Sequence, residues 1–443
     1  MRRNAWTNAV QPETIQDLRK LIAFAIANHQ TVVPRGGGHS FDAARNSNGM
    51  TLDLTLFRDI LAWDREQGII TVEPGVTIDE LLRTVVGSGW WPGVLPLKKE
   101  ATIGSCLALN ASGVNAWHAG SIGERVSAFD LLLPSGDLVP VTIRNNDKLF
   151  HSAIGGLGLL GVITSITLQL QPIPSGKLLM RRRFADSIAR MFDIFVEESP
   201  REGYLMGRID GNAQAEHIGS GIVLCGNFIE EVDPPFPPPR TWDVPPSIAQ
   251  LVSHLLSGFN TKVGNWMLLS QSLFDRDRDA EYIPIEQFHF PLSPVHYFLR
   301  NILLRGCYFF HPFVPARQAP AVFSRLLQLS QQSGFVPLWC IMRQHRSDAF
   351  VLSSQVDGFS LELAYPVIWH DEARFVHLLR AMLNQVIEAG GRLYLAQDRI
   401  LDAQTFEQMM GSKTIDRFLE IKRVYDRGNL FQSNLSRRLF RTE

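Results

Sequence analysis

The chain has 443 residues, of which 45% are hydrophobic and 20% charged, and its formal net charge is −1. This length is enough to form the hydrophobic cores of two or three domains, and the composition is that of an ordinary globular protein. The near-neutral charge gives no reason to expect a nucleic-acid partner, so we expect binding to be local and pocket-based.

The cysteines are too widely spaced to suggest a shared site; they are Cys106, Cys225, Cys307 and Cys340. Without a CxxC pair they argue against a zinc site and a disulfide framework, and no metal is expected. The first residues lack the apolar core of a secretory signal, and no apolar stretch reaches the roughly 18 residues of a membrane span. We therefore expect a cytoplasmic protein, for which peripheral membrane contact stays open.

A glycine-rich loop lies near the start of the chain. An amphipathic helix is expected from Pro12 to about Asn28, followed by strands at 31–33 and 50–54 with the run RGGGHSF between them. Three successive glycines leave backbone N–H groups uncovered and tolerate positive φ, which suits a cradle for a phosphate or pyrophosphate. His39 follows directly and would place an imidazole beside that cradle. The alternative is a glycine-rich turn with an incidental histidine.

Small residues dominate from Ala101 to Gly123, after a strand at 69–73 and a helix at 77–87. Such a run cannot pack a bulky core and fits best against a flat ligand. A flexible surface loop, the alternative, would needlessly expose Leu107, Leu109 and Val114. A hairpin around 134–137 and a short helix at 147–154 come next.

The glycines at 156, 158 and 161 match the GxGxxG spacing of dinucleotide-binding sites. That fingerprint needs a strand before it and a helix after it, whereas here a helix precedes and a strand follows. We therefore reject a Rossmann site and expect either a close backbone approach to a ligand or a tight helix-to-strand connection.

The second half of the chain alternates helices and strands after a junction at 171–179. We expect strands in RRRFA, YLMGRIDG, GIVLCGNFI, CYFFHPFVP, PLWCIMRQH, GFSLELAYPV and RLYLAQD, and helices at 186–198, 318–333 and 371–389. This layout predicts one antiparallel sheet with helices on one face. A Pro-rich stretch at 233–246 reads as an exposed loop or lid, 247–302 is aromatic and helix-leaning, and the tail 402–443 is helical.

Taken together, these motifs resemble the vanillyl-alcohol-oxidase-type (PCMH-type) FAD flavoproteins. The matching elements are VVPRGGGHSF, VEPGVTIDELL, ATIGSCLALNASG, HAGSIGERVSAFDLLLPSGD and DKLFHSAIGGLGLLGVIT. The C-terminal half is most similar to the decaprenylphosphoryl-ribose oxidase and sugar or alditol oxidase branch, through GGRLYLAQD and IKRVYDRGNLFQSNLSRRL.

The resemblance implies an α+β fold of two lobes. The FAD-binding domain would be residues 1–175, the substrate or cap domain 176–395, and the segment 396–443 would return to the FAD domain. The cap would contribute an antiparallel sheet flanked by helices that covers the flavin ring.

The resemblance also implies which residues hold FAD. They are Arg35, Gly36, Gly37, Gly38, His39, Ser40, Thr102, Ile103, Gly104, Ser105, Asn110, Gly113, Asn115, Gly120, Ser121, Gly161, Val162 and Ile163. His39 falls where covalent members join a histidine to the flavin, so we expect covalent FAD. Because no cysteine lies in the loop 119–123, a second covalent bond is not expected. Trp117 and His118 sit near this loop, and Trp117 is expected to pack against the ring.

Oxidation of an alcohol by a flavin needs a proton acceptor within about 3 Å of the substrate oxygen. The resemblance to the phosphoribose oxidases implies a lysine at the position where this chain has Gln397, and a glutamine can serve neither as base nor as cation. The catalytic candidates are His311, Arg343, Gln397 and Glu362, with Asp398 as a further possibility. His311 alternates with phenylalanines and is expected to be the base, a satisfied core histidine being the alternative.

These features predict an FAD-dependent oxidoreductase that oxidises a CH–OH group of a sugar, polyol, aldonolactone or lipid-linked sugar. The electron acceptor would be oxygen, a quinone or a redox protein. The alternatives are a flavin-dependent reductase of a carbon–carbon double bond and a flavin-binding protein without turnover.

Overall fold

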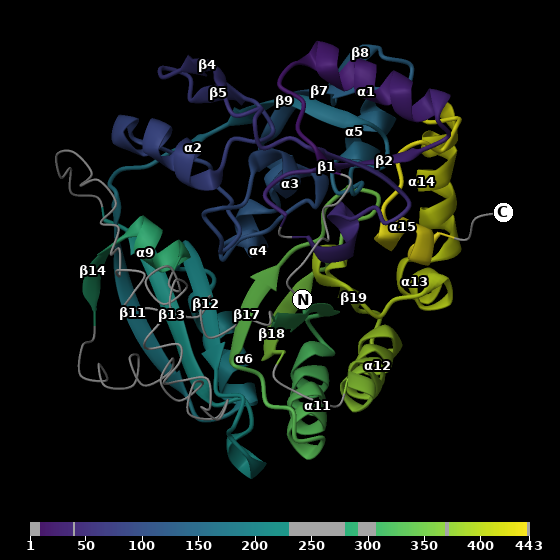
Figure 1. Ribbon diagram of the computed structural model, residues 1–443. Helices are drawn as coiled ribbons and strands as arrows, with labels where there is room; N and C mark the ends of the chain where they lie inside the picture. Colours follow the sequence, from purple (N-terminus) through teal and green to yellow (C-terminus); the bar gives the residue numbers. More distant parts are fainter. Residues whose placement is uncertain (1–8, 39, 230–279, 291–306, 368–371, 441–443) are drawn as a thin grey trace, which may run out of the picture.

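The computed structural model describes residues 9–38, 40–229, 280–290, 307–367 and 372–440. The Pro-rich stretch 233–246, most of the aromatic segment 247–302 and His39 lie outside the described residues. The described chain forms two lobes, each built on its own sheets (Figure 1).

The first lobe begins with a small parallel sheet of order β1-β3-β2. Its elements are β1 (Ala9–Val10), α1 (Ile15–Ala27), β2 (Thr31–Arg35) and β3 (Gly49–Asp53). Thr14 caps α1 by accepting a hydrogen bond from the backbone N–H of Asp17. The apolar face of α1 packs with Val32 and Leu52 in one buried cluster, which fixes the helix over the strands that flank the glycine loop.

A five-stranded antiparallel sheet of order β4-β5-β9-β7-β8 completes this lobe. Its strands are β4 (Ile60–Asp64), β5 (Ile69–Val72), β7 (Val126–Leu132), β8 (Leu138–Thr142) and β9 (Val162–Gln169). The helices are α2 (Ile78–Val85), α3 (Ile103–Ala108), α4 (Ala116–Ala119) and α5 (Asp147–Ala153), and β6 (Trp90–Trp91) pairs with β10 (Gln171–Pro172). The glycines at 156–161 connect α5 to β9, so the helix–glycine–strand order expected from the sequence is confirmed.

The second lobe is one antiparallel sheet of order β14-β11-β13-β12-β17-β18-β16-β19, with β15 also paired to β18. Its strands are β11 (Lys177–Ala185), β12 (Tyr204–Ile209), β13 (Gly221–Phe228), β14 (Glu281–Pro284), β15 (Cys307–Phe310), β16 (Pro312–Pro315), β17 (Trp339–His345), β18 (Gly358–Pro366) and β19 (Arg392–Leu393). The predicted α+β class and antiparallel sheet are confirmed.

Three helices lie together on one face of this sheet (Figure 1). They are α6 (Ile188–Glu198), α11 (Ala319–Gln332) and α12 (Glu372–Glu388), and a short α9 (Ile285–His289) follows β14. Phe192 of α6 stacks against Phe323 of α11 and Phe359 of β18, with ring centroids 5.9 and 4.7 Å away. Because side chains alternate along a strand, the neighbours of Phe359 on β18 point to the opposite face, toward the first lobe.

The large sheet is built from two βαββ units whose strand orders mirror each other. The first unit, β11-α6-β12-β13, pairs in the order β11-β13-β12, and the second, β16-α11-β17-β18, continues in the order β17-β18-β16. Only three residue pairs, Gly207–Met342 to Ile209–Cys340, join the two units at the β12–β17 seam. The sheet therefore consists of two halves with a short common boundary.

Two predicted strands differ from the structure. The run CYFFHPFVP divides into β15 and β16 at His311, because Pro312 has no N–H to donate to the ladder. In RLYLAQD only Arg392 and Leu393 form a strand, and Leu395–Gln397 turn as a 3₁₀ helix, which carries Gln397 off the sheet edge.

The C-terminal tail lies against the first lobe. Its helices, α13 (Ala403–Met410), α14 (Ser412–Tyr425) and α15 (Asn434–Leu439), appear in yellow beside α1 and β2 in Figure 1. Val32 donates a 2.8 Å hydrogen bond to the carbonyl of Leu430, and the buried Lys422 ammonium reaches the carbonyl of Leu159 at 2.8 Å. The domain limits at residues 175 and 395 stay predictions.

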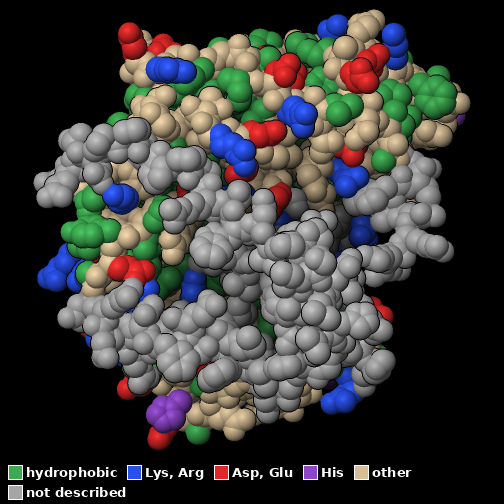
Figure 2. Space-filling view, turned by 60° about the vertical axis from the view of Figure 1, so that its left-hand side comes forward, with side chains coloured by type: hydrophobic (Ala, Val, Ile, Leu, Met, Phe, Trp, Pro, Cys, Tyr) green, Lys and Arg blue, Asp and Glu red, His purple; other side chains and the backbone are tan. Residues whose placement is uncertain are grey.

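Within the described residues, no helix is long and apolar enough to cross a membrane, and no group of His, Cys, Asp and Glu could hold a metal ion. All four cysteines are unpaired. Basic and acidic side chains intermingle over the described part of the face in Figure 2.

Candidate functional site

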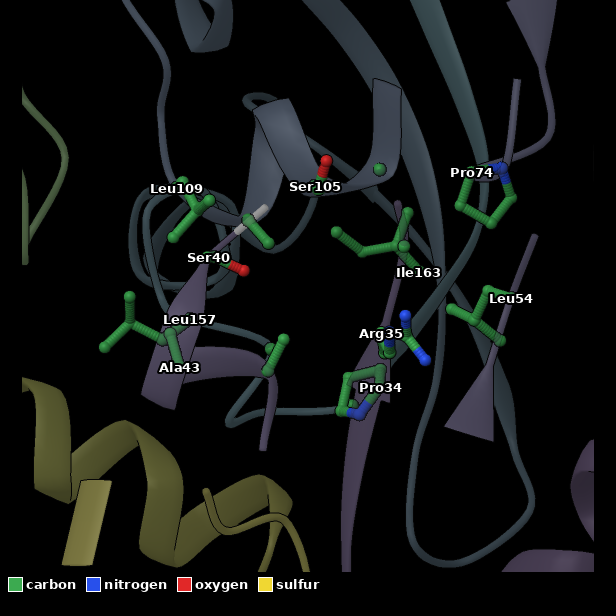
Figure 3. A pocket seen from close by; sticks show the side chains of 16 residues that line it. Pro34, Arg35, Ser40, Ala43, Leu54, Pro74, Ser105, Leu109, Leu157 and Ile163 are labelled. Atoms are coloured by element: carbon green, nitrogen blue, oxygen red, sulfur yellow. The ribbon is translucent and has the colours of Figure 1, made fainter. Parts of the chain in front are cut away.

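A cavity in the first lobe lies where the glycine loop meets α3 and the start of β9. It is lined by Pro34, Arg35, Gly36, Ser40, Ala43, Ala44, Leu54, Pro74, Gly104, Ser105, Ala108, Leu109, Leu157, Gly158, Gly161 and Ile163. Figure 3 shows the hydroxyl groups of Ser40 and Ser105 and the guanidinium of Arg35 among apolar side chains. Mixed apolar walls with a few polar groups are typical of cofactor sites.

The glycines at this cavity let its walls pack closely, because a side chain at either position would collide with a neighbouring segment. A Cβ on Gly36 would lie 2.1 Å from the Thr102 hydroxyl oxygen, and one on Gly104 would lie 2.5 Å from the Cβ of Pro74. Gly38 has φ +75°, and its backbone passes over the Arg35 guanidinium. Bare backbone beside a cation suits a pyrophosphate, because N–H groups and positive charge can both reach the oxygens.

Leu157 is a second backbone feature of this cavity. Its φ is +60°, which a leucine rarely adopts, and its N–H donates to the carbonyl of Ala108 at 2.9 Å. A strained residue of this kind, held by surrounding structure, is characteristic of ligand sites. The segment between α5 and β9 is thus fixed where it faces α3.

Eight of the predicted FAD residues line a cavity. Seven are in the first cavity, namely Arg35, Gly36, Ser40, Gly104, Ser105, Gly161 and Ile163, and Gly38 lines the second cavity described below. Gly37, Thr102, Ile103, Asn110, Gly113, Asn115, Gly120, Ser121 and Val162 line neither. Of these, Thr102 and Asn110 lie directly behind the wall of the first cavity. Thr102 leaves no room for a side chain at Gly36, and the side-chain oxygen of Asn110 accepts a hydrogen bond from the backbone N–H of Gly123. His39 lies outside the described residues.

A second cavity, of about 360 Å³, separates the first lobe from the large sheet. It shares Ser40, Ser105 and Leu109 with the first cavity, so the two adjoin. The large sheet and the turn after β19 contribute Cys307, Phe309, His311, Phe313, Trp339, Ile341, Arg343, Glu362, Tyr394, Ala396 and Gln397. All four predicted catalytic residues therefore meet in one cavity next to the predicted flavin site.

Strand register explains this convergence. Phe310 pairs with Leu363 and Phe313 with Ser360, so the register continues through the break and sets His311 opposite Glu362. Arg343 is the pairing partner of Ser360 on β17, one pleat along the same face. Side chains two residues apart share a face, which brings the three groups together from three strands.

The four side chains form one hydrogen-bonded chain. The Arg343 Nη2 group donates to His311 Nε2 at 2.9 Å and to Glu362 Oε2 at 2.9 Å. His311 Nδ1 lies 3.1 Å from Gln397 Oε1 and 3.9 Å from Glu362 Oε2. Arg343 is 3% exposed and His311 6%, so these are desolvated interactions with little screening.

Burial and the adjacent Arg343 cation hold the pKa of His311 well below its ordinary value. The same two causes lower the pKa of His345, which lies two residues beyond Arg343 and contacts the Ser360 hydroxyl at 2.7 Å. Both imidazoles are therefore neutral at neutral pH, and the charges on this face are those of Arg343 and Glu362.

Sequence reasoning missed five polar residues at the second cavity: Lys98, Lys99, Glu100, Ser112 and Tyr394. Lys99 pairs with Glu286 of α9 and lies over the Phe290 ring, while Tyr394 stacks edge-on with His311. The lysines directly precede the small-residue run, and Tyr394 belongs to the same YLAQD motif as Gln397. Their closeness in sequence to these two motifs could have identified them as site residues.

Three other candidates serve structural contacts. Asp398 does not line the second cavity; it pairs with Arg438 at 3.0 Å and accepts hydrogen bonds from two backbone N–H groups. Trp117 and His118 donate to the carbonyls of Ser199 and Gly203 in the second lobe. These two residues join the lobes.

The first cavity fits FAD. Its wall exposes glycine backbone, Arg35 supplies a cation there, and the adjoining second cavity has the space for a ring system and a substrate. This agreement rests on the shape and charge of the described residues.

Comparison with known proteins gives the same assignment. Residues 6–142 match the family described as FAD binding domain. Over 441 residues the chain is 24% identical to decaprenylphosphoryl-β-D-ribose oxidase of Mycolicibacterium smegmatis, which covers 97% of this chain and 93% of that protein.

Two further relatives match over shorter lengths. L-galactono-1,4-lactone dehydrogenase of Brassica oleracea is 30% identical over 37% of this chain and 27% of its own length, and D-lactate dehydrogenase of Anaerostipes hadrus is 28% identical over 37% of this chain and 36% of its own. The chain is an FAD-dependent oxidoreductase with a PCMH-type FAD-binding domain.

Proposed function

We propose that this protein oxidises a CH–OH group of a sugar, polyol, aldonolactone or lipid-linked sugar. The observation that carries this proposal is the Arg343–Glu362 pair at the second cavity, next to the FAD site. A carboxylate and a guanidinium held 2.9 Å apart can together accept a hydroxyl proton and hold the oxygen it leaves.

The flavin, when bound, supplies the acceptor for the hydride from the carbinol carbon. The chain must then supply the proton acceptor. Glu362 Oε2 is occupied by Arg343, whereas Oε1 has no hydrogen-bond partner among the described residues. Glu362 is thus placed to receive the substrate's hydroxyl proton on Oε1.

The contacts support Glu362 rather than His311 in this role. Nε2 of His311 already accepts a hydrogen bond from Arg343, and Nδ1 faces Gln397, so no lone pair is left for the substrate. An imidazolium beside the Arg343 cation would also be strongly disfavoured. In this assignment His311 supports Arg343, and Arg343 orients the substrate oxygen.

The charges around the second cavity support an uncharged polyhydroxylated substrate at the reacting end. Arg343 is neutralised by Glu362, and Lys99 by Glu286. A carboxylate-bearing substrate would meet the Glu362 anion, whereas hydroxyl groups can donate to it. The ribose and lactone relatives are in keeping with this class of substrate.

We further propose that FAD is covalently bound through His39, by a bond from an imidazole nitrogen to the 8α carbon of the flavin. This bond would replace one C–H bond of the methyl group and the imidazole N–H, the two electrons would pass to the flavin itself, and the electron acceptor would then reoxidise it. The support is the position of His39 in the sequence, directly after Gly38, which lines the second cavity. The electron acceptor is proposed to be oxygen, a quinone or a redox protein.

The test is anaerobic reduction of the protein-bound flavin. Polyols, aldoses and aldonolactones are each added to the oxidised protein, and loss of the visible flavin absorbance is followed. Bleaching by at least one of these classes, and none by NADPH alone, is the expected result. Bleaching by NADPH without any CH–OH donor would instead indicate a reductase, and no bleaching by any compound would contradict turnover.

A further inference from the structure

The hydrogen bonds at the second cavity fix where the protons of His311 reside. An arginine guanidinium carries only donors, so the nitrogen of His311 that it contacts at 2.9 Å must be an acceptor. Nε2 therefore carries no proton. A neutral imidazole has one N–H group, which must then be on Nδ1.

The orientation of Gln397 follows from the same reasoning. Its side chain lies 3.1 Å from Nδ1, and an N–H at Nδ1 requires an acceptor there. Only the amide oxygen of Gln397 can accept, so the amide group is turned with Oε1 toward His311. A donor at position 397, such as a lysine ammonium, would need an unprotonated Nδ1 as its acceptor. It would therefore favour the tautomer with the proton on Nε2, where that proton would face the N–H group of Arg343.

Arg343 is the member of the chain that this arrangement holds. Both hydrogens of its Nη2 group are used, one on His311 and one on Glu362. Its Nε atom is buried and has no hydrogen-bond partner among the described residues. The guanidinium of Arg343 is thus held through its Nη2 group. Its other N–H groups remain able to donate, and the side chain lines the second cavity.

We propose that Gln397 is a positioning residue, whose amide oxygen fixes the Nδ1–H tautomer of His311 so that Nε2 can hold the Arg343 guanidinium in place at the substrate cavity. This inference rests on the proposed function for its catalytic consequence, although the tautomer itself does not.

Several charged and titratable groups surround His311 and would influence it. Arg343 and His345 face it from β17 and Glu362 from β18, while Tyr394 stacks on it from the segment after β19. Across the cavity the first lobe contributes Lys98, Lys99, Glu100 and Cys106. Substitutions at position 397 leave these groups unchanged, so spectral changes can be attributed to the lost or reversed hydrogen bond.

The experiment is long-range ¹H–¹⁵N NMR of the flavin-containing protein labelled in its histidines, with the His311 signals assigned from a His311→Asn variant. The unsubstituted protein should show a protonated Nδ1 and an unprotonated Nε2 at neutral pH. Gln397→Glu keeps an acceptor and should retain this tautomer while raising the pKa of His311. Gln397→Met leaves Arg343 alone to hold the tautomer, so a minor population protonated on Nε2 should appear, and Gln397→Lys should reverse the tautomers.

The signals of His345 serve as an internal control, since its partner is Ser360 rather than Gln397. Flavin reduction by a substrate should slow about tenfold in Gln397→Lys, the scale of one lost hydrogen bond. A protonated Nε2 in the unsubstituted protein, or a tautomer indifferent to all three substitutions, would overturn the inference. If the tautomers behave as expected but no CH–OH compound reduces the flavin, the proposed function fails and the structural assignment stands.

Discussion

Asp348, in the connection between β17 and β18, accepts a 2.7 Å hydrogen bond from the side-chain amide of Asn110 in the first lobe. The same carboxylate oxygen also accepts from the hydroxyls of Ser121 and Ser353. Two residues of the small-residue run are thereby held by one side chain of the second lobe. The lobes are joined by directed polar contacts as well as by packing.

Replacement of Asp348 by alanine should therefore destabilise the protein. The donors on Asn110 and Ser121 would lose their acceptor in a largely buried setting, which costs about 2 kcal/mol. Urea unfolding should report this loss, while Asp416→Ala on the exposed part of α14 should change stability little. An equal effect of the two substitutions would mean that the Asp348 contacts contribute nothing specific.

Gly36→Ala should greatly reduce FAD binding. The added Cβ would lie 2.1 Å from the Thr102 hydroxyl and 3.3 Å from Ser105, so the wall of the first cavity must shift. The flavin-to-protein absorbance ratio after purification measures this effect. Gly428→Ala is the matched control, because a Cβ added at Gly428 would have nothing within 4 Å of it. Restored binding in a Gly36→Ala/Thr102→Ala double variant would attribute the defect to that contact.

His39→Ala should abolish covalent attachment of the flavin. Trichloroacetic acid should leave the yellow colour in the precipitate of the unsubstituted protein and release it from the variant. His29→Ala, at the end of α1, serves as control and should keep its colour after precipitation. Colour in the supernatant of the unsubstituted protein would contradict the covalent proposal outright.

Glu362→Gln should slow flavin reduction about 10²-fold or more, the usual effect of losing a general base. The amide is nearly isosteric and can still accept from Arg343, so FAD content should not change. Stopped-flow absorbance under anaerobic conditions measures the step directly. His311→Ala should also slow this step, through displacement of Arg343. Near-normal reduction in Glu362→Gln together with a large loss in His311→Ala would return the base role to His311.

The pH dependence of stability should reflect buried histidines. Burial lowers the pKa of His289 to about 4 from an ordinary 6.5, so the folded state binds its proton less tightly than the unfolded state. The stability that neutral His289 contributes is present above pH 6.5 and is lost as pH falls toward 4. Between pH 7 and pH 5 this amounts to about 2 kcal/mol.

His289→Phe tests this dependence by removing the titrating group. The ring lies among Trp91, Tyr204 and Phe288, so phenylalanine should pack in its place. The variant's free energy of unfolding should fall by about 2 kcal/mol less than that of the unsubstituted protein between pH 7 and pH 5. The exposed His217→Gln variant should leave the pH dependence unaltered, and an unchanged slope in His289→Phe would refute the assignment.

Much of the fold could be predicted from sequence patterns because these are local. Thr77 and Glu80 form a capping box at the start of α2, and the glycines after α5 mark the turn into β9. The antiparallel sheet followed from the alternation of strands with two long helices. The break at His311 and the short β19 were missed, because they depend on Pro312 and on the 3₁₀ turn at Leu395–Gln397 within the assembled sheet edge.

The catalytic candidates were found by type and position, but their relationships could not be. His311 and Glu362 are 51 positions apart, and only the β15–β18 register sets them opposite each other. The neutral state of His311 likewise depends on Arg343, which arrives from a third strand. Sequence spacing carries no information on such contacts, so the proposal of Glu362 rather than His311 as the base depends on the geometry of the cavity.

The two mirrored halves of the large sheet contribute unequally to the second cavity's hydrogen-bonded chain. All four residues of the hydrogen-bonded chain come from the half that contains β15 to β19 and the turn after it, whereas the half from β11 to β13 contributes none. A boundary of three residue pairs separates the two. The candidate site is thus built on one half of the sheet, while the other half supports it through the packing of Phe192 on Phe323 and Phe359.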